Sequence, residues 1–179
     1  MYDAYSHGDQ YVFAFGPESD FQNPDIVAGF VFEGGLSLPE RAYYLEDKYK
    51  DIRDAFVAHV ERMLVLGGAA PAAAKKQAAA VLAFETRLAG ASLSPIEMRD
   101  PKNQYHWVTV AEANKVTPHF SWDKFLAAEK VNVPGFSLSQ PKFMAEFDKM
   151  LVETPVADWQ AYLRYHALSG SAPFLSSDV

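Results

Sequence analysis

The pattern of apolar and polar positions changes once along the chain. Residues 11–15 (YVFAF) and 26–32 (IVAGFVF) are rich in aromatic and β-branched side chains, and the segment between them is dense in Gly, Pro, Asn and Asp. This pattern predicts a two-stranded β-hairpin with a long loop. From Leu38 onward the strand pattern ends, and the start and stop signals of helices replace it.

Two long helices are predicted after the hairpin, over residues 47–66 and 71–89. The second is alanine-rich, and alanine has the highest helix propensity of all residues. Gly67-Gly68 separates the two helices, so we expect an antiparallel pair. The first helix should bury one face, because apolar residues recur at helical spacing at Tyr49, Ile52, Phe56, Val60 and Met63.

The later helices are predicted from their start signals. Ser94 with Glu97, and Thr109 with Glu112, fit the capping box, in which the hydroxyl accepts a hydrogen bond from the third backbone N–H and the glutamate accepts one from the first. Three more starts are predicted at Ser121, at Ser139-Gln140-Pro141 for a helix to about Val152, and at Thr154-Pro155 for a helix to about Ser169.

These elements place the chain in the mainly α class, as a multi-helix body with an N-terminal two-stranded β-hairpin. The hairpin region is assigned to residues 1–36 and the helical body to residues 37–179. No internal repeat or low-complexity linker divides the sequence, so we expect residues 1–179 to form a single domain.

Composition excludes several classes of partner and chemistry. The chain of 179 residues carries 16 Lys and Arg against 23 Asp and Glu, a net charge of −7 that repels nucleic acid. It has no cysteine, which excludes thiol catalysis, disulfides and thiolate metal ligands. No stretch approaches the roughly 18 apolar residues of a membrane span, and residues 1–7 show no targeting signal. We therefore expect a cytosolic protein or a piece of a longer one.

Candidate catalytic chemistry is sparse. The zinc-protease motif His-Glu-x-x-His is absent, and no serine lies in a Gly-x-Ser-x-Gly elbow. Gly34-Gly35 and Gly67-Gly68 lack the spacing of a phosphate-binding loop and are interpreted as turns. No two histidines lie three or four residues apart, at His7, His59, His106, His119 and His166. The residues themselves give no catalytic group and no metal ligand.

The segment GGLSLPERAYYL, residues 34–45, resembles the Gly-Gly-Leu-Gly-Leu-Pro-Asp-Arg-Asp-Tyr-Tyr-Leu segment of the neprilysin and endothelin-converting-enzyme family of zinc metallopeptidases. Further matches follow in the family's order, at residues 83–89 (AFETRLA), 98–101 (MRDP) with Tyr105, 118–122 (PHFSW) and 158–166 (DWQAYLRYH). Ordered matches across nearly the whole chain make this resemblance specific.

The resemblance implies a fragment of the mostly helical, non-catalytic N-terminal region, which in the family encloses a substrate cavity and admits oligopeptides. No cofactor is then expected in this chain, because the family's zinc is bound by a C-terminal domain beyond it. The implied partners are the catalytic domain of the same polypeptide and peptide substrates. The implied parent is exported, in bacteria to the periplasm, and the missing cysteines fit bacterial members.

The resemblance also marks residues for structural or domain-docking roles. Gly34-Gly35 is expected to end the second strand, and Pro39 to start a helical turn. The chain departs from the family with Glu33 for glutamine, Ser37 for glycine, and Ala42 for the aspartate that follows the arginine. The structural or docking candidates are Arg41, Tyr43, Tyr44, Glu85, Arg99 and Asp100.

Two further predictions concern burial. Glu85 lies beside Phe84 and one turn from Leu88, so its carboxylate should be buried and paired, with Arg99 as the expected partner. A piece that faces a catalytic domain should also expose an apolar patch, because a lone hairpin cannot bury both of its faces. The first candidates for that patch are Phe13, Phe15, Phe30 and Phe32.

Two alternatives remain open. The first is a self-contained helical module that binds a protein or a peptide; only the acidic character and the many aromatic residues support it, and a core explains the aromatic residues equally well. A small hydrolase that uses paired carboxylates has no positive support in the sequence. A His-Glu-x-x-His motif downstream in the reading frame would establish the peptidase reading.

Overall fold

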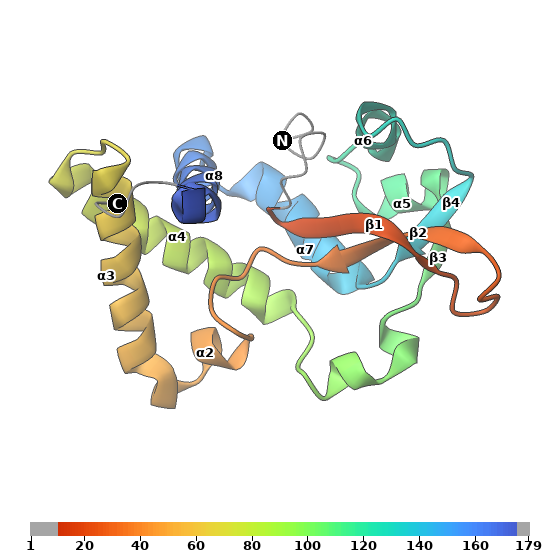
Figure 1. Ribbon diagram of the computed structural model, residues 1–179, viewed down its shortest axis with the longest axis horizontal. Coiled ribbons are helices and arrows are strands. Elements are labelled where there is room, and N and C mark those ends of the chain that lie inside the picture. The colour runs from red at the N-terminus through yellow and green to blue at the C-terminus, as the bar shows by residue number, and fades with distance from the viewer. Residues whose placement is uncertain (1–10, 175–179) are drawn as a thin grey trace. The chain divides into compact units, whose positions relative to one another are not determined.

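The computed structural model describes residues 11–174, which form two compact units. We call the first the sheet unit (residues 11–36 and 91–153) and the second the helical unit (residues 37–90 and 154–174). One division between the units falls after residue 36, and residues of the region assigned to the helical body occur in both units. That residues 1–179 form a single domain stays a prediction. Residues 1–7, which show no targeting signal, lie outside the described part. Figure 1 shows the elements in chain order.

A four-stranded mixed sheet organises the sheet unit, in the order β1-β2-β4-β3. β1 and β2 form the predicted antiparallel hairpin, β2 pairs with β4 in parallel, and β3 pairs with β4 antiparallel. The prediction of a hairpin alone was therefore incomplete, since β3 and β4 are too short to show an alternating pattern. The strands are β1 (Phe13–Ser19), β2 (Val27–Glu33), β3 (Trp107–Thr109) and β4 (Gly135–Leu138).

β1 runs further than its sequence suggested. It passes the predicted end at residue 15 and continues through Gly16 and Pro17 to Ser19. Pro17 pairs with Gly29 of β2, and β1 lies at the edge of the sheet. An edge strand tolerates proline, because the missing N–H can point away from the ladder.

The aromatic residues of the hairpin pack inside the sheet unit. Phe13 and Phe30 are buried, and Phe15 and Phe32 are half-buried. Naming Phe13 and Phe30 as exposed-patch candidates was therefore wrong. The hairpin is not alone, because β4 extends its sheet and aromatic rings cover Phe13. The rings that contact Phe13 belong to Phe120, Trp122, Phe125 and Phe147.

Helices of the sheet unit begin where their caps predict. Thr109 and Glu112 form both bonds of the capping box at α5 (Val110–Val116), and the Ser121 hydroxyl accepts the Lys124 N–H at α6 (Trp122–Ala128). The Ser94–Glu97 box is also present, although it opens only a single 3-10 turn. α7 (Pro141–Glu153) starts at the predicted proline and ends one residue beyond the predicted Val152.

Within residues 37–90 and 154–174, the helical unit contains three long helices, one short α-helical turn and the 3-10 turns Asp47–Tyr49 and Ala172–Phe174. α3 (Lys50–Leu66) and α4 (Pro71–Ala91) match the two helices predicted from spacing, and α8 (Val156–Ser171) matches the one predicted from Thr154-Pro155. α2 (Ala42–Leu45) is the short turn, which begins three residues after Pro39. The described chain is mostly helical, which confirms the mainly α class.

One apolar core joins the long helices of the helical unit. α3 contributes Phe56, Val60 and Leu64, and α8 contributes Ala161 and Tyr165. Small side chains on α4 let the helices approach closely, at Ala74 and Ala78. Among residues 11–174, no helix combines the length and apolar character needed to cross a membrane.

Candidate functional site

A buried carboxylate on α4 is the centre of the polar structure in the helical unit. Glu85 is 0% exposed, and its neighbours Phe84 and Leu88 face the core with it. The sequence predicted this burial correctly. A carboxylate out of contact with water must be bound by hydrogen-bond donors, because an unpaired buried charge costs several kcal/mol.

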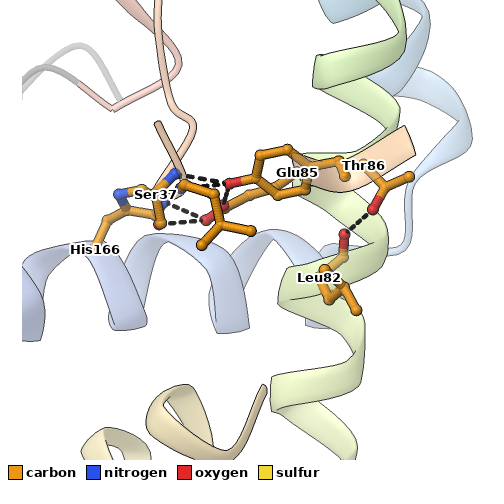
Figure 2. Close-up of polar contacts among 7 residues, drawn as sticks. Ser37, Leu82, Glu85, Thr86 and His166 are labelled. Carbon is orange, nitrogen blue, oxygen red and sulfur yellow. Dashed lines mark hydrogen bonds and ion pairs between the residues drawn. The ribbon is translucent and has the colours of Figure 1, made fainter. Parts of the chain in front are cut away.

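Three side chains and one backbone group bind the Glu85 carboxylate, as Figure 2 shows in part. Oε2 accepts the Ser37 N–H at 2.9 Å and the Tyr44 hydroxyl at 2.6 Å. Oε1 accepts the Ser37 hydroxyl at 2.8 Å and lies 2.9 Å from His166 Nε2. Each oxygen therefore has two partners. The bonds join Ser37, in the loop before α2, and Tyr44, in α2, to the middle of α4 and the second half of α8. We call Ser37, Tyr44, Glu85 and His166 together the Glu85 clasp.

Tyr44 fixes the backbone of the loop as well. Its hydroxyl donates to Glu85 and accepts the N–H groups of Ser37, at 3.0 Å, and Leu38, at 2.7 Å. Burial, followed by the negative charge of Glu85 and the hydrogen bond to it, raises the pKa of Tyr44 far above its usual value. The hydroxyl therefore stays protonated and remains a donor. The start of the loop, at Ser37 and Leu38, is therefore hydrogen-bonded to the Tyr44 side chain at its end.

Local sequence explains the shape of this loop. Gly35 adopts φ of +77°, which a residue with a side chain rarely takes, and β2 has ended at Glu33 as predicted. Arg53 of α3 donates to the carbonyl oxygens of Tyr43 and Glu46, at 2.9 and 2.8 Å, which ties the end of α2 to α3. The Tyr43 ring stacks on Tyr49 with 4.2 Å between centroids. These contacts hold α2 and the turn after it against the start of α3.

The predicted bridge between Glu85 and Arg99 was wrong. Arg99 is exposed in the 3-10 turn Glu97–Arg99 of the sheet unit, so it cannot form a buried pair. Glu85 is instead satisfied by the neutral donors Ser37 and Tyr44 and by His166. The error has a physical cause: closeness in sequence suggested Arg99, but a buried carboxylate needs donors of the right geometry rather than a particular cation.

The other docking candidates lie in three places. Tyr44 and Glu85 meet in the clasp, and Arg41 and Tyr43 are half-buried on the same loop. Asp100 is exposed in the sheet unit, where its carboxylate caps a 3-10 turn by accepting the Lys102 N–H at 3.0 Å. A docking role for these residues stays a prediction.

Sequence reasoning missed two members of the clasp. Ser37 and His166 lie 48 and 81 residues from Glu85, and no spacing rule connects positions so far apart. In the sequence, Ser37 stands out only as a departure from the family's glycine. Its hydroxyl now supplies a donor that a glycine would lack. The His166 side chain is 17% exposed and its ring lies 4.3 Å from that of Tyr162, so it is held between core and solvent.

The chemistry of the Glu85 clasp is that of a structural hydrogen-bond network, which stabilises the fold. Its carboxylate is inaccessible, and two groups of the protein contact each of its oxygens. Burial also raises the pKa of Tyr165, the neighbour of His166 on α8. Among residues 11–174, no group of three or more His, Asp or Glu side chains is arranged to hold a metal ion.

Comparison with known proteins assigns the family. The family model described as Peptidase family M13, an N-terminal model, matches residues 1–179. The chain belongs to peptidase family M13. The resemblance to neprilysin-like zinc metallopeptidases is thereby confirmed.

Curated M13 relatives are much longer than this chain. Mouse endothelin-converting enzyme-like 1 is 29% identical over 176 residues, which cover 93% of this chain and 22% of the relative. Human endothelin-converting enzyme 1 is 31% identical over 111 residues, which cover 61% of this chain and 14% of the relative. The chain therefore spans less than a quarter of the length of these M13 proteins.

Solved structures share the fold. The zinc metalloprotease Zmp1 of Mycobacterium tuberculosis, solved with an inhibitor, matches with a TM-score of 0.91 and 21% identity, over 99% of this chain and 28% of Zmp1. PepO from Lactobacillus rhamnosis HN001 matches with a TM-score of 0.81 and 16% identity, over 99% of this chain and 29% of PepO. At such identities the likeness concerns the M13 fold alone.

Proposed function

We propose that this chain is the non-catalytic, cavity-enclosing part of a neprilysin-like zinc endopeptidase that cleaves oligopeptides. The observation that carries the proposal is the M13 match over residues 1–179, together with a fold that corresponds to only 28% of a zinc metalloprotease. In this proposal the catalytic domain of the same polypeptide is the partner, and it binds the zinc. Peptides are the substrates, and the parent protein is exported.

In this proposal, the Glu85 clasp keeps the loop of residues 37–44 in a fixed shape within the wall of the substrate cavity. A cavity wall limits access only if its loops keep their shape, and hydrogen bonds to a buried charge are among the stronger ones that a loop can make. Ser37 and Tyr44 hold the loop on α4, while Arg41 and Tyr43 stay near its surface. We assign Arg41 and Tyr43 to docking against the catalytic domain, with Arg99 and Asp100 as candidates on the sheet unit.

The proposal is tested by comparing the 179-residue chain with the longer polypeptide that contains it. The chain alone should hold no stoichiometric zinc and show no chelator-sensitive hydrolysis of short peptides. The longer polypeptide should show both, and its activity should fall steeply as substrates grow from short peptides to folded proteins. A variant of the longer polypeptide without its zinc-binding histidines is the control for contaminating peptidases.

Two results would contradict the proposal. Zinc-dependent hydrolysis by the chain alone would place catalysis within these residues. A longer polypeptide that cleaves folded proteins as fast as short peptides would show that no enclosed cavity selects its substrates. Peptide binding by the chain, combined with inactivity of the longer polypeptide, would favour the self-contained binding module.

A further inference from the structure

A pocket in the sheet unit combines positive charge with a buried hydrogen-bond donor. Its volume is about 240 Å³, and it lies where residues 91–97, residues 102–106 and the start of α7 meet. Lys102 and Lys142 line it together with Gln140 and Phe143. This is unexpected in a chain with a net charge of −7, whose surface as a whole repels anions.

Gln140 is the buried donor. It is 4% exposed, and its Oε1 accepts the Glu33 N–H at 2.8 Å, which fixes the orientation of the amide. Its Nε2 is therefore the remaining end of the side chain, and it has no hydrogen-bond partner among the described residues. A buried amide N–H₂ without an acceptor costs about 1–3 kcal/mol, so a ligand that supplies an acceptor is favoured there.

The backbone adds donors at the same place. α7 starts at Pro141, and Met144 is the first residue whose N–H bonds back to Gln140. Helix geometry leaves the N–H groups of Lys142 and Phe143 without an intrahelical acceptor, and such a terminus favours a negative charge. Both residues line the pocket.

The balance of charge selects the kind of anion. The lysines Lys102 and Lys142 bring two positive charges, and Glu97, which also lines the pocket, brings one negative charge. The Glu97 carboxylate is held by the N–H and the hydroxyl of Ser94, at 2.8 and 2.7 Å. The Glu33 carboxylate, which accepts the N–H of the lining residue Leu93 at 3.1 Å, adds a second negative charge beside the pocket. With so little excess positive charge, the pocket suits a monovalent carboxylate better than a doubly charged phosphate.

We propose that this pocket binds a carboxylate group, either of a small free acid or of a peptide C-terminus, with the Gln140 Nε2 amide and Lys142 as its principal donors. The inference does not depend on the proposed function, because the pocket lies within the sheet unit and binding is measured on this chain alone. A single carboxylate in a pocket of this size should bind with a dissociation constant of about 1–10 mM.

Nuclear magnetic resonance titration of the ¹⁵N-labelled 179-residue chain tests the proposal. The probes are acetate, N-acetylalanine, N-acetylalanine amide and inorganic phosphate, at constant ionic strength. Acetate and N-acetylalanine should shift the Gln140 side-chain amide and the Lys142 backbone amide, and the uncharged amide should not. Tighter binding of N-acetylalanine than of acetate identifies a peptide C-terminus as the source, and equal binding identifies a small free acid.

Substitutions separate the pocket from the general surface. Gln140→Glu keeps an acceptor for the Glu33 N–H but replaces the donor with a negative charge, and it should weaken acetate binding at least about tenfold. Lys142→Gln, at an exposed position, leaves the fold intact and should weaken binding about three- to tenfold. Lys149→Gln, near the other end of α7, is the matched control and should change nothing.

Three results would overturn the proposal: no shift of the Gln140 amide with either carboxylate, phosphate binding as tightly as acetate, or an equal effect of Lys142→Gln and Lys149→Gln. The first would show that the pocket has no ligand of this class. The last would show that the response reflects net charge alone.

Discussion

The sheet unit and the helical unit hold distant segments together by different means. In the sheet unit, Phe13 of β1 lies with its ring 5.5 Å from that of Phe125 on α6 and 5.7 Å from that of Phe147 on α7, so packed aromatic rings join the strand to two helices. In the helical unit, Glu85 joins the loop before α2 to α8 through directional hydrogen bonds. The aromatic core depends on the volume of its side chains, whereas the Glu85 clasp depends on which atoms donate and which accept hydrogen bonds.

This difference determines what each region tolerates. An aromatic core loses stability mainly when volume is removed, and a side chain of similar size and polarity retains most of it. A buried carboxylate with two partners on each oxygen has no equivalent replacement, because even its amide isostere brings a donor to a site that already consists of donors. The comparison yields four predictions, in order of decreasing effect.

Removing ring volume from the sheet unit should have the largest effect. Phe125→Ala should lower the free energy of unfolding by about 3–5 kcal/mol, because the fully buried ring leaves a cavity. Phe125→Leu should cost less, about 1.5 kcal/mol, since most of the apolar volume remains. Urea unfolding followed by near-ultraviolet circular dichroism measures both. Equal costs for the two variants would show that volume does not dominate this core.

In the helical unit, a change of almost no volume should still be costly. Glu85→Gln should lower the free energy of unfolding by about 2–3 kcal/mol, because the new N–H₂ group faces donors and the charge that strengthened the bonds is lost. Lys76→Gln, at an exposed position of the same helix, is the control and should stay within about 0.5 kcal/mol of the parent chain. If the Glu85→Gln protein were as stable as the unsubstituted chain, the contrast between the two units would be wrong.

A single donor of the clasp should have a smaller effect. Ser37→Ala removes the hydroxyl that donates to Glu85 Oε1 but keeps the N–H that donates to Oε2, so it should cost about 1 kcal/mol. Ser171→Ala, at the exposed end of α8, is the matched control with no expected change. Thermal unfolding of the two variants side by side gives the difference. Equal midpoints would mean that the Ser37 hydroxyl contributes nothing.

The last effect is a dependence on alkaline pH, which is absent near neutral pH. The pKa of Tyr44 is raised in the folded chain and lies near its ordinary 10.0 when unfolded, so above about pH 10 the folded state binds more protons. Stability that is present below pH 10 is then lost as pH rises, by at most about 1.4 kcal/mol per pH unit for this group. Tyr44→Phe should flatten the slope of stability between pH 9 and 11.

Tyr165 makes the flattening of the alkaline slope by Tyr44→Phe smaller but does not reverse it. Its pKa is also raised by burial, so part of the alkaline slope should persist in the Tyr44→Phe variant. Measurement at pH 8 separates the hydrogen bonds lost with the hydroxyl from the effect of titration. Identical slopes in the two proteins would show that Tyr44 does not hold its proton more tightly in the folded state.

Much of the secondary structure follows from local rules. The capping box at Thr109, the cap at Ser121 and the proline start of α7 each involve residues within four positions of one another, and each prediction is confirmed. The strands β3 and β4 were missed for the opposite reason. They have three and four residues, and they are strands only because β2 and each other supply their hydrogen-bond partners.

The sequence by itself determined that the chain is mainly helical, that it belongs with the zinc metallopeptidases of its family, and that Glu85 is buried, because its apolar neighbours on α4 oblige it to face inward. Only the tertiary structure decided that Ser37, Tyr44 and His166 surround that carboxylate. The reason is physical: periodicity and caps record interactions within one element, whereas the partners of a buried charge come from wherever the packed backbone brings donors within hydrogen-bond distance.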